Sequence, residues 1–153
     1  MLIDGRSGSG KTTLGASLVP LIEGAQLVGL DDVYPGWNGL ADASRQVVET
    51  ILRPVAPGYR RWDWAGSRPA GWRSLDPARP LIVEGAGSLT PASAALATFR
   101  IWVELDEATR RARVAGRSDA EAYAPWWAMW ALQEDAHVEA DDPRALADTV
   151  LVG

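Results

Sequence analysis

The stretch Gly5-Arg6-Ser7-Gly8-Ser9-Gly10-Lys11-Thr12 matches the pattern G-x-x-x-x-G-K-[ST] at every fixed position. Before it, residues 1–3 form a short apolar run that predicts a buried strand. After it, residues 12–19 have the apolar spacing of a helix, which ends at Pro20 because proline disrupts a continuing helix. A strand, a glycine-rich turn and a helix N-terminus in this order make a cradle for phosphate groups. The run 1–3 is shorter than most central strands, and the sequence leaves open whether further residues precede it.

The residue types of this loop predict how it would hold a triphosphate. Its glycines would let backbone N–H groups converge on phosphate oxygens, because a Cβ atom there would clash or forbid left-handed dihedral angles. Lys11, the only lysine in the chain, would reach the β- and γ-phosphates, and the Thr12 hydroxyl would ligate Mg²⁺. The alternative is a loop that only turns the chain, and the flanking strand and helix argue against it. We therefore predict ATP and Mg²⁺ as ligands, and the expected nucleotide-binding residues are Gly5, Ser7, Gly8, Ser9, Gly10, Lys11, Thr12 and Thr13.

The composition fits a globular protein and excludes several other classes. The chain has 153 residues, of which 47% are hydrophobic, and this is enough for one core. Its net charge of −5 disfavours a nucleic-acid partner, and the absence of cysteine excludes disulfides and thiolate metal sites. No stretch is long enough for a membrane span, and Asp4 comes too early for a signal peptide. We expect a soluble cytoplasmic protein without a membrane partner, whose oligomeric state the sequence leaves open.

Acidic residues follow two further predicted strands. Residues 25–30 form a buried strand that runs into Asp31 and Asp32, and the apolar run 81–86 carries Glu84. Because ligand-binding groups gather at the carboxyl ends of parallel strands, we expect these acids to lie beside the phosphate loop. Glu84 would then hold the metal or its water shell. The two aspartates have a plainer alternative as a turn and helix N-cap, since aspartates before Pro-Gly often have only that role.

The helix predicted over residues 40–52 ends at Pro54, and the segment 54–80 then changes character. It mixes tryptophan, arginine, proline and glycine, which is a poor composition for a core element and favours a flap or hairpin over a site. Its aromatic side chains could stack on a planar base, and its arginines could hold an anion. Arg61 and Trp62 are the substrate contacts that we expect here. The alternative is a solvated hairpin whose tryptophans pack onto the body of the domain.

A strand over residues 99–105 precedes a helix that we expect to act as a lid, in the region 106–124. Asp106 is the predicted N-cap of this helix. Three arginines fall on one helix face at spacings of three and four, and clustered like charges favour an anion in front of them. The plainer alternative is an exposed basic face. These arginines are Arg110, Arg113 and Arg117.

The remaining part of the chain completes the expected fold. The aromatic run 123–132 predicts a helix that packs against the sheet or, alternatively, forms a wall of the substrate site. Glu134 and His137 lie one helical turn apart, but no second histidine is present, so no metal site is predicted there. Residues 148–152 predict a last strand. Strands alternating with helices predict one domain over 1–153 with an α/β, three-layer P-loop NTPase fold and a mainly parallel central sheet flanked by helices.

Together these motifs resemble the uridine kinase-like branch of the P-loop kinases, and the resemblance covers nearly the whole chain in order. Asp31 and Tyr34 match the family's Asp-x-Phe-Tyr element, with Val33 in place of phenylalanine, and Glu84-Gly85 matches its Glu-Gly element. The resemblance implies an ATP-dependent kinase that transfers the γ-phosphoryl group to a hydroxyl of a small molecule. The first acceptor that it implies is a nucleoside such as uridine or cytidine.

The same resemblance implies roles for the site residues. Asp31 would orient and deprotonate the acceptor hydroxyl, and Asp32 would be a second-choice base or a ligand of metal-bound water. The catalytic residues are expected to be Lys11, Asp31, Arg113 and Arg117. The metal ligands are expected to be Thr12, Glu84 and Asp32. The substrate contacts are expected to be Asp31, Tyr34, Arg61 and Trp62.

Other classes of protein also carry a phosphate loop. A GTPase usually has an Asn-Lys-x-Asp element, which Lys11 as the only lysine cannot supply in addition to its loop role. A motor ATPase usually has Asp-Glu where this chain has Glu84-Gly85. A regulatory module that binds a nucleotide without turnover stays open. So do nucleoside monophosphates, sugars and antibiotic-like alcohols as acceptors.

Overall fold

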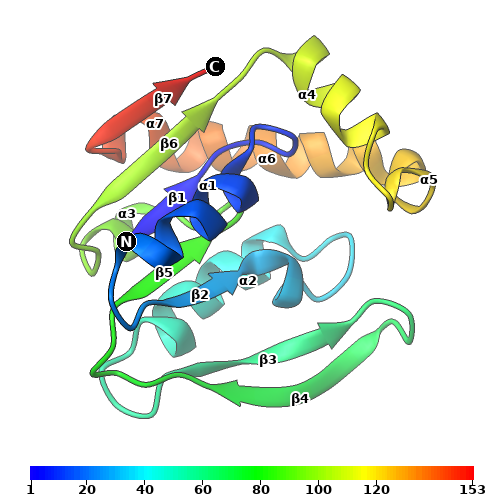
Figure 1. The fold of residues 1–153 in the computed structure, drawn as a ribbon. Coiled ribbons are helices and arrows are strands. Elements are labelled where there is room, and N and C mark those ends of the chain that lie inside the picture. Colours follow the sequence, from blue (N-terminus) through cyan, green and yellow to red (C-terminus); the bar gives the residue numbers. More distant parts are fainter.

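The computed structural model describes residues 1–153 and contains a five-stranded sheet with helices on both faces (Figure 1). The strand order is β2-β5-β1-β6-β7, all neighbours are parallel, and the antiparallel hairpin β3-β4 lies beyond the β2 edge. The strands are β1 Leu2–Asp4, β2 Gln26–Gly29, β3 Gly58–Asp63, β4 Arg68–Ser74, β5 Leu81–Glu84, β6 Arg100–Glu104 and β7 Thr149–Val152. The α-helices are α1 Lys11–Leu18, α2 Leu40–Gln46, α3 Pro91–Ala94, α4 Glu107–Ala115, α5 Ala120–Tyr123, α6 Trp127–Asp141 and α7 Pro143–Leu146. The predicted three-layer α/β architecture is confirmed.

Strand β1 is the centre of the sheet and separates two cores. Leu2 and Ile3 are both fully buried, and because successive strand residues point to opposite faces, each joins a different cluster. Leu2 belongs to the larger cluster, under the helices that follow β2 and β6. Ile3 packs with Ile82 and Ile101 under α1. A short apolar run can therefore form the central strand, because both of its faces are covered.

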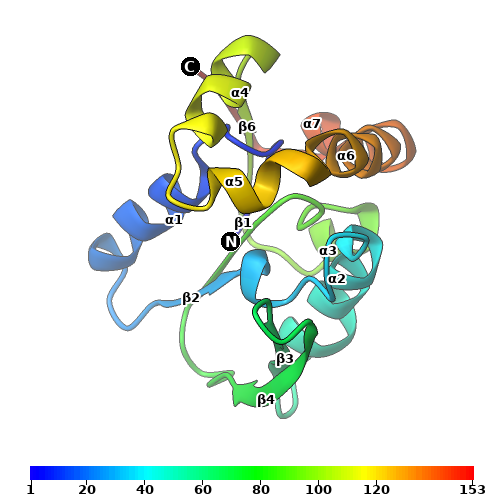
Figure 2. The ribbon, with the colours of Figure 1, turned by 90° about the vertical axis from the view of Figure 1, so that its right-hand side faces the viewer.

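The helices divide between the two faces of the sheet (Figure 2). Helix α1 covers one face, and α2, α3, α6 and α7 lie on the other. Helix α4 stands at the carboxyl edge of the sheet, next to the loop that follows β1. None of the helices combines the length and the apolar character that a membrane crossing needs.

Three helix boundaries differ in detail from the sequence-based expectation. The helix expected over 40–52 consists of α2 followed by a π-helical turn, Val47–Ile51. In this turn the Thr50 hydroxyl donates to the Gln46 carbonyl, and such a bond tends to bend a helix. Gly116 caps α4, so the expectation that Arg117 continues the same helix face is wrong. Pro125 lies in a 3₁₀ turn, Ala124–Trp126, and α6 therefore begins at Trp127.

A buried carboxylate connects β1 with the loop after β5 and with α6. Asp4 is fully buried; one carboxylate oxygen accepts the N–H groups of Gly5 and Gly87, and the other accepts the N–H of Leu89. His137 of α6 bonds to Asp4 through Nε2 at 3.0 Å and to Asp141 through Nδ1 at 2.8 Å. Burial alone would lower the pKa of His137, but the hydrogen bonds and charges of the two aspartates outweigh it and raise the pKa. The imidazole therefore holds its proton to a higher pH in the folded chain than an ordinary histidine does.

We predict that His137 makes the stability of the fold depend on pH. Because its pKa is raised on folding, its contribution is complete below the ordinary value of 6.5 and is lost as pH rises through the folded value. His137→Gln should therefore lower the free energy of unfolding most at acidic pH and least at alkaline pH, as measured by urea unfolding. Burial lowers the pKa of the Met1 amino group, which therefore also makes stability depend on pH. Both proteins keep this group, so the difference between them isolates the effect of His137. An equal loss of stability at every pH would contradict the prediction.

Candidate functional site

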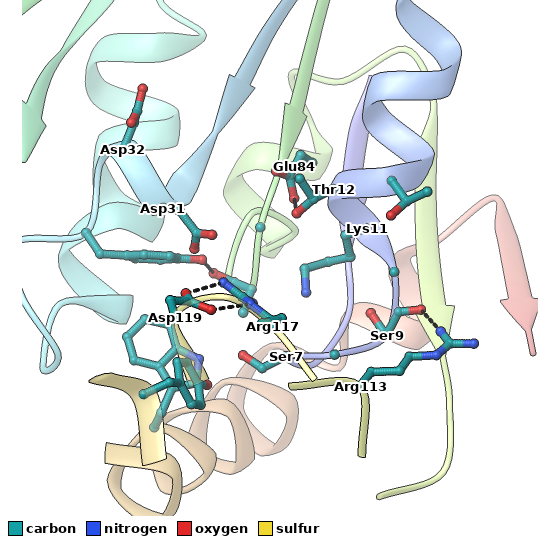
Figure 3. Close-up of a pocket in the computed structure, with 18 of the residues that line it drawn as sticks. Ser7, Ser9, Lys11, Thr12, Asp31, Asp32, Glu84, Arg113, Arg117 and Asp119 are labelled. Atoms are coloured by element: carbon teal, nitrogen blue, oxygen red, sulfur yellow. Dashed lines mark hydrogen bonds and ion pairs between the residues drawn. The ribbon is translucent and has the colours of Figure 1, made fainter. Parts of the chain in front are cut away.

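A cavity of about 1130 Å³ lies at the carboxyl edge of the parallel sheet (Figure 3). It is lined by the loop after β1 and the start of α1, by residues after β2, and by the end of β5 with the residues after it. The hairpin, the region 113–123 where a lid was expected, and α6 complete the lining. The following predicted residues meet there: Ser7, Gly8, Ser9, Gly10, Lys11, Thr12, Thr13, Asp31, Asp32, Tyr34, Glu84, Arg113 and Arg117. Gly5, Arg61 and Trp62 do not line it.

The loop between β1 and α1 has the geometry of an anion nest. Gly8 has φ +81°, and a Cβ atom on it would lie 2.5 Å from the carbonyl oxygen of Arg110, so no other residue fits. Gly10 at the N-cap of α1 supplies no side chain to the first-turn N–H groups, which have no partner within the helix. Lys11 is 7% exposed, and its Nζ donates to the Arg6 carbonyl at 3.0 Å, across the loop. Open N–H groups and a cation at a helix N-terminus suit a phosphate.

Thr12 and Glu84 bring a hydroxyl and a carboxylate together beside Lys11. The Thr12 hydroxyl donates to Glu84 Oε2 at 3.3 Å. Glu84 ends β5 and is 4% exposed, and its side chain fits because Gly15 and Gly29 leave room around it. Burial raises the pKa of Glu84, Lys11 offsets part of this effect, and the charge of Asp31 adds to it. The carboxylate thus lies in a low-dielectric environment between a cation and a second acid.

The two aspartates after β2 point in different directions. Asp31 is exposed to the cavity and projects toward the side where Lys11 and Glu84 lie (Figure 3). Asp32 lies at the rim and points away, and its carboxylate pairs with Arg61 of the hairpin at 3.7 Å. The structure therefore brings Asp31 together with the phosphate loop but does not bring Asp32 to Thr12 and Glu84.

The lid arginines have three different surroundings. Arg110 is buried, and its guanidinium donates to the carbonyls of Leu105 and Ser7, so it supports the loop backbone and does not face the cavity. Arg113 donates to the Ser9 carbonyl at 3.3 Å, at the mouth of the loop. Arg117 is held by a two-fold ion pair with Asp119, with N–O distances of 2.8 and 2.7 Å.

One side of the cavity is an aromatic wall, which consists of Tyr34, Trp37, Trp64, Tyr123 and Trp130. Tyr34 is buried; its hydroxyl donates to the Ala86 carbonyl at 2.9 Å, and its ring meets that of Trp130 edge-on at 4.7 Å. Trp64, at the turn of the hairpin, donates its indole N–H to the Asp31 carbonyl at 2.8 Å. The hairpin therefore reaches the site through Trp64, two residues beyond the expected Trp62.

The phosphate loop also depends on two residues of α6 to which the sequence analysis assigned no role. Glu134 is 2% exposed, and its Oε1 accepts the backbone N–H of Ser7 at 2.7 Å and the indole N–H of Trp130 at 3.0 Å. His137, one turn further along, bonds to Asp4 at the start of the loop. The only sequence signal was their spacing of one helical turn, which could not show what they face.

The oxygen donors of the site suit magnesium better than a metal that needs many protein ligands. No group of three or more histidine, cysteine, aspartate or glutamate side chains forms a metal cluster. Mg²⁺ commonly takes one or two protein oxygens and completes its shell with phosphates and water. Thr12 and Glu84 offer such a pair next to the phosphate loop. The residues present therefore fit a magnesium-bound triphosphate.

Comparison with known proteins places this geometry in a known fold. No protein-family model and no curated protein matches the sequence. Among solved structures, the chain is similar to a possible uridine kinase from Bacillus stearothermophilus, with a TM-score of 0.64 and 19% sequence identity. The similarity covers 98% of this chain and 86% of that one. The chain therefore has the α/β fold of the P-loop kinases.

Proposed function

We propose that the protein is an ATP-dependent kinase that transfers the γ-phosphoryl group to a hydroxyl of a small molecule. One observation carries the proposal: the phosphate loop, the Thr12–Glu84 pair and the free Asp31 carboxylate line the same cavity. A triphosphate site alone would serve many classes of protein. A carboxylate projecting into the cavity beside it adds a group that can activate an acceptor.

Binding of the triphosphate would use the loop N–H groups and Lys11. The backbone would surround the phosphate oxygens, and Lys11 would neutralise charge on the β- and γ-phosphates. Thr12 and Glu84 would hold Mg²⁺, which when bound neutralises charge on the phosphoryl group. Phosphoryl transfer needs mainly such positioning and charge compensation, so this part of the site would supply most of the catalytic effect.

The transfer step would use Asp31 as the general base. The acceptor oxygen attacks the γ-phosphorus, the bond to the β,γ-bridging oxygen breaks, and ADP leaves. The proton of the acceptor hydroxyl passes to the Asp31 carboxylate, which projects into the cavity. Arg113 and Arg117 would close over the reacting group, because water in the site would compete with the acceptor.

The acceptor that we propose is a nucleoside. The resemblance in the sequence motifs and the fold shared with a possible uridine kinase support this choice. The cavity of about 1130 Å³ is large enough for a nucleotide and a second small molecule, and its aromatic wall lies on the Asp31 side. Nucleoside monophosphates, sugars and antibiotic-like alcohols are the acceptors to compare with nucleosides.

Acceptor-dependent release of ADP tests the proposal. We expect Mg·ATP to give ADP at a rate set by the acceptor in a panel of nucleosides, nucleoside monophosphates and sugars. Lys11→Ala should lower turnover by at least about 100-fold, because the charge on the transferring group is no longer neutralised. Arg144→Ala is the matched control, since this arginine pairs with Glu104 outside the cavity. ADP release at one rate with and without every acceptor would show a hydrolase instead.

The two aspartates can be separated by isosteric substitution. Asp31→Asn should reduce transfer by about 10²- to 10⁴-fold while the affinity for Mg·ATP stays nearly unchanged, because only the general base is lost. Asp32→Asn, the matched control, should have a small effect, since Asp32 pairs with Arg61 and points away from the loop. Steady-state kinetics and calorimetric titration with Mg·ATP give both quantities. If the Asp31→Asn variant keeps full activity, Asp31 is not the base.

The buried Glu84 carboxylate should make magnesium dependence sensitive to pH. Its raised pKa means that it takes up a proton at a higher pH than an ordinary glutamate, and a protonated carboxyl does not bind the metal. The Mg²⁺ concentration for half-maximal activity should therefore rise as pH falls, and the rise should begin at a higher pH than an ordinary glutamate would cause. In Glu84→Gln the half-maximal concentration should be high throughout and should lose this pH dependence. Equal magnesium profiles of the two enzymes would exclude Glu84 as a ligand.

A further inference from the structure

The aromatic wall is assembled around Trp37. Its ring centroid lies 4.9 Å from that of Trp64 and 5.3 Å from that of Tyr123. It also stacks on Trp126, at 5.7 Å and an angle of 12°. The rings come from three separate segments: the loop after β2, the hairpin turn and residues 123–126. Trp64, which lines the cavity, is 37% exposed, so part of its ring surface remains available to a ligand, whereas Trp126 supports Trp37 from outside the cavity lining.

Three of the five polar side-chain atoms of this wall are bonded within the protein, and the indole N–H of Trp37 has no partner. Trp64 donates to the Asp31 carbonyl, Trp130 to Glu134 and Tyr34 to the Ala86 carbonyl. The Tyr123 hydroxyl has no partner, but it is buried and does not reach the cavity surface. A ligand on this side therefore meets ring faces and ring edges, with the Trp37 indole N–H as the one indole donor of the wall that remains without a partner.

The rest of the lining also lacks groups that read a base. No asparagine, glutamine or histidine lines the cavity. Serines and threonines are confined to the phosphate loop and α1. One N–H of Arg113 donates to the Ser9 carbonyl, and Arg117 is paired with Asp119, so both arginines lie on the side of the phosphate loop and lid. The carboxylates of Asp31 and Asp32 can only accept hydrogen bonds. Asp31 lies at the position proposed for the reacting hydroxyl, and Asp32 lies at the rim. The cavity lining thus offers no set of side-chain donors and acceptors that is complementary to the edge of a nucleobase.

We infer that the acceptor is held by stacking of its base on the Trp37–Trp64 part of the aromatic wall, and that purine and pyrimidine nucleosides are accepted alike. This inference rests on the proposed function. Every base has a π face, so stacking is tolerant of base identity. Trp64 is bonded to the backbone of Asp31, which keeps the stacking surface next to the carboxylate that would orient the hydroxyl.

The size of the expected discrimination follows from the chemistry of such a site. A site that hydrogen-bonds its substrate rejects an analogue without the matching group by about 10⁴- to 10⁵-fold, whereas an apolar pocket distinguishes similar ligands by about 10- to 200-fold. We expect kcat/KM for uridine, cytidine, adenosine and guanosine to lie within about 100-fold of one another. Ribose, which lacks the base, should be a much poorer acceptor than all four.

Variants of Trp64 separate stacking from the support that this residue gives to Asp31. Trp64→Ala should raise KM for all four nucleosides by about 10- to 100-fold, while Kd for Mg·ATP stays unchanged. Trp64→Phe keeps a ring but loses the indole N–H, and it should restore most of the affinity. Trp72→Ala is the matched control, because Trp72 is an exposed tryptophan of the same hairpin that does not line the cavity.

Several results would overturn the inference. A preference for one base above about 10³-fold, or a KM that Trp64→Ala leaves unchanged, would show that the base is read in another way. Equal activity with ribose would show that no base is bound. If sugars or nucleoside monophosphates release ADP and nucleosides do not, this inference fails while the kinase proposal stands. If Mg·ATP binds but no acceptor in the panel increases ADP release, the kinase proposal fails with it.

Discussion

The arrangement of the site depends on the buried carboxylate of Asp4. This residue ends the central strand, and its two oxygens accept N–H groups from Gly5, at the start of the phosphate loop, and from the loop after β5. A fully buried carboxylate is costly unless it is hydrogen-bonded, and these N–H groups offset that cost. His137 adds a bond from α6. One side chain thus holds three segments in register at the edge of the sheet where the cavity lies.

The electrostatics of the cavity follow from the same placement. Parallel strands carry their following residues to one edge, so the loop after β1, Asp31 after β2 and Glu84 at the end of β5 converge. The cationic side chains come from the start of α1 (Lys11) and from the region after β6 (Arg113 and Arg117). Acids and cations therefore face each other across the space that a magnesium-bound triphosphate and its acceptor would share. Burial of Glu84 strengthens these interactions, because little water screens them.

The acceptor side of the site has a different construction. The hairpin and the lid bring tryptophan and tyrosine side chains from distant parts of the chain against the loop that follows β2. Because Trp64 bonds to the backbone of Asp31, the hairpin and the proposed base form one unit. The parallel sheet and phosphate loop are features of the fold, whereas this wall is made by segments outside the sheet. Substrate choice would therefore be decided there.

Local patterns in the sequence were enough to predict the strand–loop–helix unit around Lys11 and the acids at the ends of two strands. These features depend on residue spacing and on the position of a residue relative to a strand end, and together they predict the parallel α/β fold. Which side chains face the cavity is a property of the folded chain. Trp62 lies within β3 and Trp64 in the turn that follows it, so the even spacing of the two tryptophans in the sequence could not show that only Trp64 would reach the site. Only the fold decides that the Asp32 side chain pairs with Arg61 while Asp31 projects into the cavity, and that Arg110 donates to the backbone of the phosphate loop. The contacts of Glu134 and His137 span more than 120 residues, and no local pattern specifies them.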